Sequence, residues 1–135
     1  MIVLDEQLLG RNLENEIGRW YQGAVRFIID LRPNTVIKDD AIPGLLQQER
    51  QPTFVTINER DFWRKVQPSN SYCLVCFTLP DSRVNEIAQD LRELFQHTDF
   101  NTKSKRMGKI IRVTDRVVTY YTVNLKQIQT VDFYS

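Results

Sequence analysis

Hydrophobic residues near the start of the chain form two short runs with a helix-like pattern between them. The runs cover Ile2 to Leu4 and Ala24 to Ile29, the second interrupted by Arg26. Apolar, β-prone runs of this length are typical of strands. Between them, apolar residues recur at steps of three and four, which predicts an amphipathic helix from Arg11 to Tyr21. The opening segment is therefore expected to form a strand, a helix and a second strand.

The rest of the chain continues this alternation. Asp39 or Asp40 is a candidate N-cap for a short helix to about Glu49, with Pro43 in its first turn. The strongest helical stripe follows Pro80 and ends near residue 97. Strands are expected around these helices, over residues 54–57, 72–77, 110–113 and 117–123, with one or two helical turns over residues 59–66.

Strands that alternate with helices predict an α/β domain with a mostly parallel central sheet. The last two strands flank the turn Thr114 to Arg116 and are expected to form a closing C-terminal β-hairpin. A length of 135 residues predicts a single domain, 1–135. Residues 124–135 form a tail that is apolar enough to pack, either on this domain or against a second copy.

Composition and charge narrow the class of protein. The chain has 18 basic and 17 acidic residues, a net charge of +1 and a hydrophobic content of 41%. This balance excludes the overall basic excess of a dedicated nucleic-acid binder but leaves room for a local basic patch. The first apolar run is too short for a signal peptide, and no run reaches the ~18 residues of a membrane span. A cytoplasmic protein is expected.

Cys73 and Cys76 have the CxxC spacing of redox and zinc sites. The run around them is apolar and β-prone, and no second CxxC or nearby His completes a zinc site. In a strand, residues three positions apart face opposite sides. We therefore predict two buried, reduced thiols, which fits a cytosolic location.

Acidic residues follow the expected strands and open one of the helices. Asp5 ends the first run, Asp61 follows the run at 54–57, and Asp39 lies between them in the chain. The carboxyl ends of parallel strands meet at one sheet edge, where open α/β sheets bind ligands. Oxygen-rich clusters suit Mg²⁺ or Mn²⁺. The alternative for Asp5 and Asp39 is helix capping, and for Asp61 the first turn of a short helix.

The order of these segments resembles the compact PIN-like domains, which are related to the PIN ribonucleases of toxin–antitoxin systems. The resemblance covers about residues 2–123 and rests on several short motifs in sequence order. They are Leu4-Asp5-Glu6, Ile29-Asp30-Leu31, Asp39 with Ile42, and the segment Val55 to Phe62. The last is similar to the family motif in which a Thr is followed by two Asp residues and a Phe. The resemblance implies a three-layer α/β/α sandwich.

The resemblance also implies an activity, which is metal-dependent hydrolysis of RNA by an endoribonuclease. Asp5 would be the central ligand of a Mg²⁺ or Mn²⁺ ion, with Asp39 and Asp61 as further ligands. Thr56 would orient a ligand or water through its hydroxyl. The implied partners are RNA, an antitoxin protein and, in a homodimer, a second copy of the chain.

Asn58 departs from the family motif, which usually has an Asp after the Thr. Asn58 can still line the site, but it lacks a negative charge, and a Mg²⁺ site needs charge as well as oxygen. Glu6 or Glu59 could restore that charge. The alternative function is therefore a catalytically degenerate domain that binds a protein or RNA.

Basic residues supply candidate contacts to RNA phosphates, with an ordinary solvated loop as the alternative. The nucleic-acid-binding candidates are Lys103, Lys105, Arg106, Lys109, Arg60 and Arg64, to which Arg11 adds charge near the acidic edge. The aromatic residues Trp20, Tyr21 and Trp63 could stack on bases, but their helical positions favour core packing. His97, the only histidine, ends a helix, where its charge complements the helix dipole.

Overall fold

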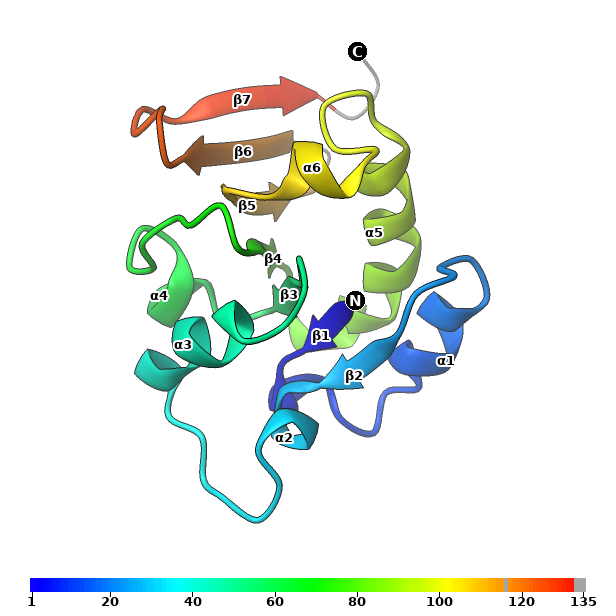
Figure 1. Ribbon diagram of the computed structural model, residues 1–135. Helices are drawn as coiled ribbons and strands as arrows, with labels where there is room; N and C mark the ends of the chain where they lie inside the picture. Colours follow the sequence, from blue (N-terminus) through cyan, green and yellow to red (C-terminus); the bar gives the residue numbers. More distant parts are fainter. Residues whose placement is uncertain (116, 133–135) are drawn as a thin grey trace.

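The computed structural model describes residues 1–115 and 117–132 and has a seven-stranded sheet at its centre (Figure 1). The strands are β1 (Ile2–Leu4), β2 (Val25–Phe27), β3 (Thr53–Thr56), β4 (Cys73–Thr78), β5 (Lys109–Thr114), β6 (Val117–Thr122) and β7 (Gln129–Asp132). The α-helices are α1 (Leu13–Gly18), α2 (Ile28–Leu31), α3 (Ile42–Gln47), α4 (Glu59–Phe62), α5 (Ile87–Gln96) and α6 (Lys103–Arg106). The 3₁₀ helices are η1 (Glu6–Leu8), η2 (Asp39–Ala41) and η3 (Asp81–Glu86).

The strand order in the sheet is β2-β1-β3-β4-β5-β6-β7. The pairs among the first five strands are parallel, whereas β6 and β7 are added antiparallel. The predicted α/β class with a mostly parallel sheet is confirmed. Register matters most between β1 and β3, where Leu4 lies beside Val55. The next residue of each strand, Asp5 and Thr56, therefore emerges at the same carboxyl edge.

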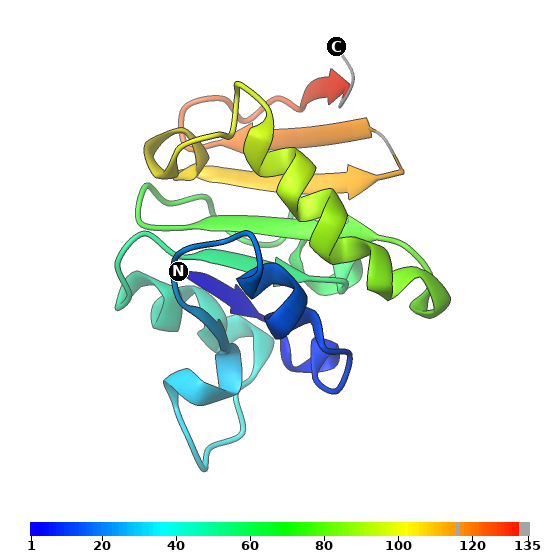
Figure 2. The same cartoon turned by 90° about the vertical axis from the view of Figure 1, so that its right-hand side faces the viewer.

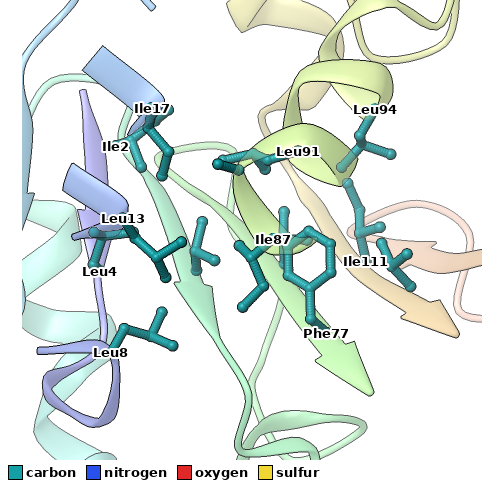
Figure 3. Packing of buried hydrophobic residues seen from close by; sticks show 14 of the residues in the cluster. Ile2, Leu4, Leu8, Leu13, Ile17, Phe77, Ile87, Leu91, Leu94 and Ile111 are labelled. Atoms are coloured by element: carbon teal, nitrogen blue, oxygen red, sulfur yellow. The ribbon is translucent and has the colours of Figure 1, made fainter. Parts of the chain in front are cut away.

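Buried side chains form two hydrophobic clusters, because alternate residues of a strand point to opposite faces. One cluster joins the strands to α1 and α5 and includes Leu4, Phe77 and Leu91 (Figure 3). The other includes Phe54 and Phe62 and takes in residues of α2, α3 and α4. Figures 1 and 2 show α1 and α5 on one side of the sheet and α3 and α4 on the other. Burial of each large apolar side chain contributes roughly 1.5–3 kcal/mol.

The two cysteines of the CxxC spacing lie in strand β4. Both are free and fully buried, and they belong to different clusters, Cys73 with α1 and α5 and Cys76 with α3 and α4. Burial raises the pKa of the Cys73 thiol to about 12. The prediction of two buried, reduced thiols facing opposite sides is confirmed.

The second apolar run is shorter as a strand than predicted. Only Val25 to Phe27 pair with β1, and the chain then turns directly into α2. The carboxylate of Asp30 accepts the backbone N–H of Phe27 at 3.1 Å, which stabilises this turn. An apolar run by itself does not separate a strand from a buried helical turn, and here a local hydrogen bond decides.

Residues 98–106 contain α6 and two buried side chains. Phe100 is fully buried against Tyr120, with ring centroids 5.5 Å apart. Arg106 is only 6% exposed. Its guanidinium lies 3.9 Å from the ring centre of Phe95 and donates to the carbonyl oxygen of Phe100 at 2.9 Å. The segment is therefore anchored to the core by one aromatic ring and one arginine.

The end of the chain extends the sheet. Strands β5 and β6 pair antiparallel as predicted for a hairpin, with Thr114 opposite Val117. They do not close the sheet, because part of the predicted tail forms β7 and pairs with β6. Residues 116 and 133–135 lie outside the described residues. Across the described residues, no helix combines the length and apolar character needed to cross a membrane.

Candidate functional site

Asp5 and Thr56 meet at the carboxyl edge of the sheet, as their positions after β1 and at the end of β3 predict. The hydroxyl of Thr56 donates to Oδ2 of Asp5 at 2.6 Å. The same Thr56 oxygen accepts the backbone N–H of Asn58 at 3.0 Å. Asp5 is 4% exposed and Thr56 is fully buried, so the hydrogen bond holds the Asp5 carboxylate in a fixed position.

Asn58 links this pair to Asp61 in α4. Asn58 is the N-cap of α4, and its Oδ1 accepts the backbone N–H of Asp61 at 3.2 Å. Its Nδ2 donates to Oδ2 of Asp61 at 2.8 Å. The spacing of three residues brings a cap side chain and the first helical turn together, which explains both hydrogen bonds. Asn58 therefore orients the Asp61 carboxylate.

Asp39 approaches the same point from η2. Its carboxyl group forms a hydrogen bond with that of Asp61, which raises the pKa of Asp39 and lowers that of Asp61. Partial burial, this hydrogen bond and the charge of Asp5 raise the pKa of Asp39 to about 6. The pKa of Asp61 is lowered by the hydrogen bonds from Asn58 and then Asp39. As the pH falls, Asp39 is therefore protonated before Asp61.

The buried Asp5 carboxyl also differs from an ordinary aspartate. Burial raises its pKa, the hydrogen bond from Thr56 opposes that rise, and the charge of Glu6 adds to it. Since the charge of Asp5 in turn raises the pKa of Asp39, the three carboxyl groups act on one another. Perturbed carboxyl groups of this kind are frequent at functional sites.

The helix-capping alternative is not seen for Asp39, whereas Asp5 lies at the start of a 3₁₀ helix and interacts with its backbone. Asp5 occupies the N-cap position of η1 without making a side-chain capping hydrogen bond. The N-cap of η2 is Lys38, again without such a bond, and Asp39 lies inside the helix. Asp61 does lie in the first turn of α4, but the capping side chain there is Asn58. The carboxylate of Asp39 is thus not used to cap a helix, whereas the backbone N–H groups of Glu6 and Gln7, at the start of η1, interact with Asp5 and lower its pKa.

The donor set suits a hard divalent cation, because it consists of carboxylate and amide oxygens. The observation that tests the fit is the contact between Asp39 and Asp61, where two neighbouring carboxyl groups oppose each other's ionisation and a positive charge would relieve that opposition. In residues 1–115 and 117–132, no three His, Cys, Asp or Glu side chains are grouped closely enough to hold an ion. The residues present therefore fit a divalent cation in the type of ligand atom that they offer. Asp39 and Asp61 are in contact, and Asp5 affects Asp39 through its charge.

Of the two acids that could replace the charge missing at Asn58, only Glu6 acts on the site. Its negative charge raises the pKa of both Asp5 and Asp39. Glu59 instead accepts hydrogen bonds from Thr78 at 2.9 Å and from Arg112 at 3.0 Å. Glu59 is therefore committed to the carboxyl ends of β4 and β5.

The basic segment 103–109 lies at the other edge of the sheet. Figure 2 shows the yellow α6 at the edge where β1 and β5 begin. Burial and then the charges of Lys103 and Arg106 lower the pKa of the N-terminal amine, directly before β1. Lys109 is the first residue of β5, which runs parallel with β1 and β4, whereas Asp5 follows the end of β1. Lys103, Lys105 and Lys109 are therefore not beside the acidic residues, and Arg106 is buried.

Other basic residues do lie near the acidic cluster. The charges of Arg60 and Lys65 help to lower the pKa of Asp61, after its two hydrogen bonds. Lys65 lines a cavity of about 580 Å³ together with Asp39 and Asp61. Arg64 points elsewhere and donates to the backbone oxygen of Lys126 at 3.0 Å. Sequence reasoning missed Lys65, although its position four residues after Asp61 was available as a signal.

The aromatic candidates for base stacking pack in the core instead. Trp20 and Tyr21 each pack edge-on against Phe95. Trp63 contacts Tyr121, with ring centroids 5.2 Å apart. These contacts agree with the packing role that their helical positions favoured.

Comparisons with family models, curated proteins and solved structures give no match for this chain. The arrangement offers a fixed, partly buried carboxylate cluster at the ligand-binding edge of a parallel sheet, with a cavity and a lysine beside it. Carboxylate oxygens are the ligand type that divalent cations prefer, and the carboxyl edge is where open α/β sheets bind ligands.

Proposed function

We propose that this chain is a metal-dependent endoribonuclease of the PIN-like type, with a three-layer α/β/α sandwich and RNA phosphodiester bonds as its substrate. The observation that carries the proposal is the continuous polar network from Asp5 through Thr56 and Asn58 to Asp61 and Asp39. It joins three carboxyl groups from three separate segments at one sheet edge. The sequence resemblance supplies the reaction class.

Asp39 and Asp61 would hold Mg²⁺ or Mn²⁺, with Asp5 as the third carboxylate. A bound ion would act as a Lewis acid on the phosphoryl oxygen and would lower the pKa of a water molecule bound to it, which provides a nucleophile at neutral pH. The chain's own contribution is positioning, because Thr56 fixes Asp5 and Asn58 fixes Asp61 before any substrate arrives. Lys65, in the cavity with Asp39 and Asp61, offsets part of their negative charge when a phosphate approaches.

The first test is Mn²⁺-dependent cleavage of a mixed single-stranded RNA pool by the wild type and by Asp5→Asn. The variant can still accept the hydrogen bond from Thr56 through its amide oxygen, so it is expected to fold. Cleavage by the wild type that is lost in Asp5→Asn and in EDTA supports the proposal. Cleavage by Asp5→Asn at the wild-type rate shows that this cluster is not the catalytic centre.

The resemblance extends the proposal to a toxin that is neutralised by an antitoxin protein and acts as a homodimer. If the chain is a toxin, induced expression of the wild type arrests the growth of a bacterial host, and Asp5→Asn does not. Equal growth with both proteins, at matched soluble levels, excludes toxicity through this site. Light scattering of the purified chain measures the oligomeric state directly.

Asn58 favours a second candidate, which is a catalytically degenerate PIN-like domain that binds RNA or a protein. Both polar atoms of its amide already bond to Asp61, and the residue carries no charge. A folded wild type with no cleavage and no Mn²⁺ affinity, beside an Asn58→Asp variant that gains Mn²⁺ affinity, would support this candidate. Calorimetric titration with Mn²⁺ makes the comparison.

A further inference from the structure

A second, smaller cavity adjoins the one that contains Asp39 and Asp61. It has a volume of about 250 Å³ and is lined by Arg64 and Lys126. Val66 and Gln67 line both cavities, so the two share a wall. A ligand that extends beyond the acidic cluster over this wall enters the smaller cavity next.

In the turn after α4, two consecutive basic residues line different cavities. Lys65 lines the acidic cavity, and Arg64 lines the smaller one. Arg64 has a φ of 64°, in the left-handed region, which redirects the chain directly after the helix. The two positive charges therefore lie on either side of the shared wall.

The Arg64 side chain is held in place by contacts on two sides. Its guanidinium lies 5.1 Å from the ring centre of Tyr121 and donates through Nη1 to the backbone oxygen of Lys126 at 3.0 Å. Tyr121 is itself buried, and its hydroxyl donates to the backbone oxygen of Val66 at 3.0 Å. A guanidinium fixed in this way loses little conformational freedom when it binds an anion.

Three other arginines of the domain are less suited to bind an anionic chain near the acidic cluster, whereas Arg60 is close enough to Asp61 to lower its pKa. Arg11 is paired with Asp81, and Arg112 with Glu59 at 3.0 Å. Arg106 is buried at the opposite edge of the sheet. Because a carboxylate cluster repels a polyanion, a strand that reaches it needs compensating cations nearby.

We propose that the smaller cavity binds the RNA strand on one side of the cleaved bond, with Arg64 and Lys126 contacting backbone phosphates and Lys65 on the path between. RNA as the ligand rests on the proposed function. The cavity gives the strand a direction, from the acidic cluster over Val66 and Gln67 towards β6. An acidic protein segment is the competing ligand, and binding measurements with RNA and with an acidic peptide distinguish the two ligands.

The test is the affinity of the full chain for a fluorescein-labelled single-stranded RNA, measured by anisotropy in EDTA so that no cleavage occurs. The variants are Lys126→Gln and Arg64→Gln. The matched control is Arg26→Gln, an exposed arginine on β2, the strand at the far edge of the sheet. A decamer of glutamate serves as the acidic-peptide probe.

Lys126→Gln and Arg64→Gln are each expected to weaken RNA binding by about tenfold, as for the loss of one charged hydrogen bond. Each should also reduce the slope of log affinity against log salt by about 0.7, the value for one phosphate contact on a single strand. Arg26→Gln should change neither quantity. Lys126 is exposed, so its variant keeps the test valid if Arg64→Gln does not fold.

The outcomes separate this inference from the proposed nuclease activity. Mn²⁺-dependent cleavage by the wild type, with unchanged RNA affinity and KM in both variants, overturns the RNA path and leaves the nuclease standing. RNA binding that depends on Arg64 and Lys126, without cleavage by the wild type, supports the path and removes the nuclease. Binding of the glutamate decamer but not of RNA overturns the path in favour of an acidic protein ligand.

Discussion

Asp39 is held in the folded protein beside groups that oppose its ionisation. Its partial burial, its contact with Asp61 and the charge of Asp5 all favour its protonated form. Nothing in the local helix requires an acid there, since η2 is not capped by a side chain. Side chains that lower the free energy of unfolding and have no structural role in return are typical of binding sites.

This cost leads to a stability prediction for Asp39→Asn in EDTA. The pKa of Asp39 rises from 3.8 to about 6 on folding, so the folded protein binds the proton more tightly than the unfolded chain. Wild-type stability contributed by this group is therefore present below pH 4 and is lost as the pH rises to about 6. Asp39→Asn should be more stable than the wild type at pH 7 and equal to it below pH 4.

Solvent screening of this exposed residue limits the gain at pH 7 to about 1 kcal/mol or less. Urea unfolding of both proteins at pH 3.8 and pH 7 measures it. Asp40→Asn, one residue along in the same 3₁₀ helix, is the control and should not show the same pH-dependent gain. If the difference in unfolding free energy between the wild type and Asp39→Asn is the same at both pH values, the raised pKa of Asp39 is contradicted.

Thr56→Val is a second change at the residue scale. It removes the hydroxyl that donates to Asp5 and leaves a buried carboxylate with one partner fewer. The expected loss of unfolding free energy at pH 7 is about 1–3 kcal/mol, as for a buried polar group left unpaired. Loss of the bond also removes the largest of the effects that lower the pKa of Asp5, so the stability deficit should shrink at low pH.

Thr56→Ser is the matched control, because it keeps the hydroxyl and removes only a methyl group. Chemical denaturation of both variants at pH 5 and pH 7 gives the comparison. Equal losses in Thr56→Val and Thr56→Ser would mean that packing, and not the hydrogen bond to Asp5, accounts for the effect. Mn²⁺-dependent cleavage of the same samples would then show whether positioning of Asp5 matters to activity.

The ends of apolar runs predicted that Asp5 and Asp61 lie at one edge of the sheet, and the family resemblance implied a role for Thr56. The sequence could not show that Asn58 bonds twice to Asp61, since that depends on rotamers within one helical turn. Nor could it show the burial of Arg106, because the aromatic ring that covers it, Phe95, comes from another helix. Side-chain direction is a tertiary property and was outside the reach of pattern reasoning.

At the scale of elements, strand direction separates the acidic residues from the basic segment 103–109. Asp5 follows β1 and Asn58 follows β3, whereas Lys109 begins β5 and the other basic residues precede it. In a parallel sheet, segments before strands and segments after strands lie at opposite edges. The predicted order of elements already contained this separation, so the basic segment could have been placed away from the acids.

This placement predicts different effects for two sets of lysine substitutions. The double variant Lys103→Gln/Lys105→Gln should leave RNA affinity and the KM for cleavage unchanged, because its side chains lie at the opposite edge from Asp5. Lys65→Gln should weaken binding, since Lys65 lies in the cavity with Asp39 and Asp61. Anisotropy titrations at 50 and 150 mM salt compare them. A larger effect from the double variant would place the RNA at the other edge.

At the scale of the whole molecule, the alternation of strands and helices was enough to predict the α/β class and the parallel sheet. The position of the tail was not predicted. A strand added by edge pairing depends on an available neighbour more than on its own pattern, and β7 pairs with β6 at the end of the sheet. Strands β4, β5 and β6 lie between it and β3.

This distance allows stability and activity to be separated in one variant, Val131→Asp. Val131 is paired with Val118 in β6 and packs against the cluster of α1 and α5. A carboxylate there should lower the free energy of unfolding by about 1–3 kcal/mol through undocking of β7. Mn²⁺-dependent cleavage at 15 °C should persist, because the acidic cluster depends on β1, β3 and α4. Thr130→Asp, at the adjacent exposed position, is the control and should change the free energy of unfolding little. Loss of cleavage in a folded Val131→Asp protein would contradict the prediction, because it would require a coupling through the sheet that these contacts do not provide.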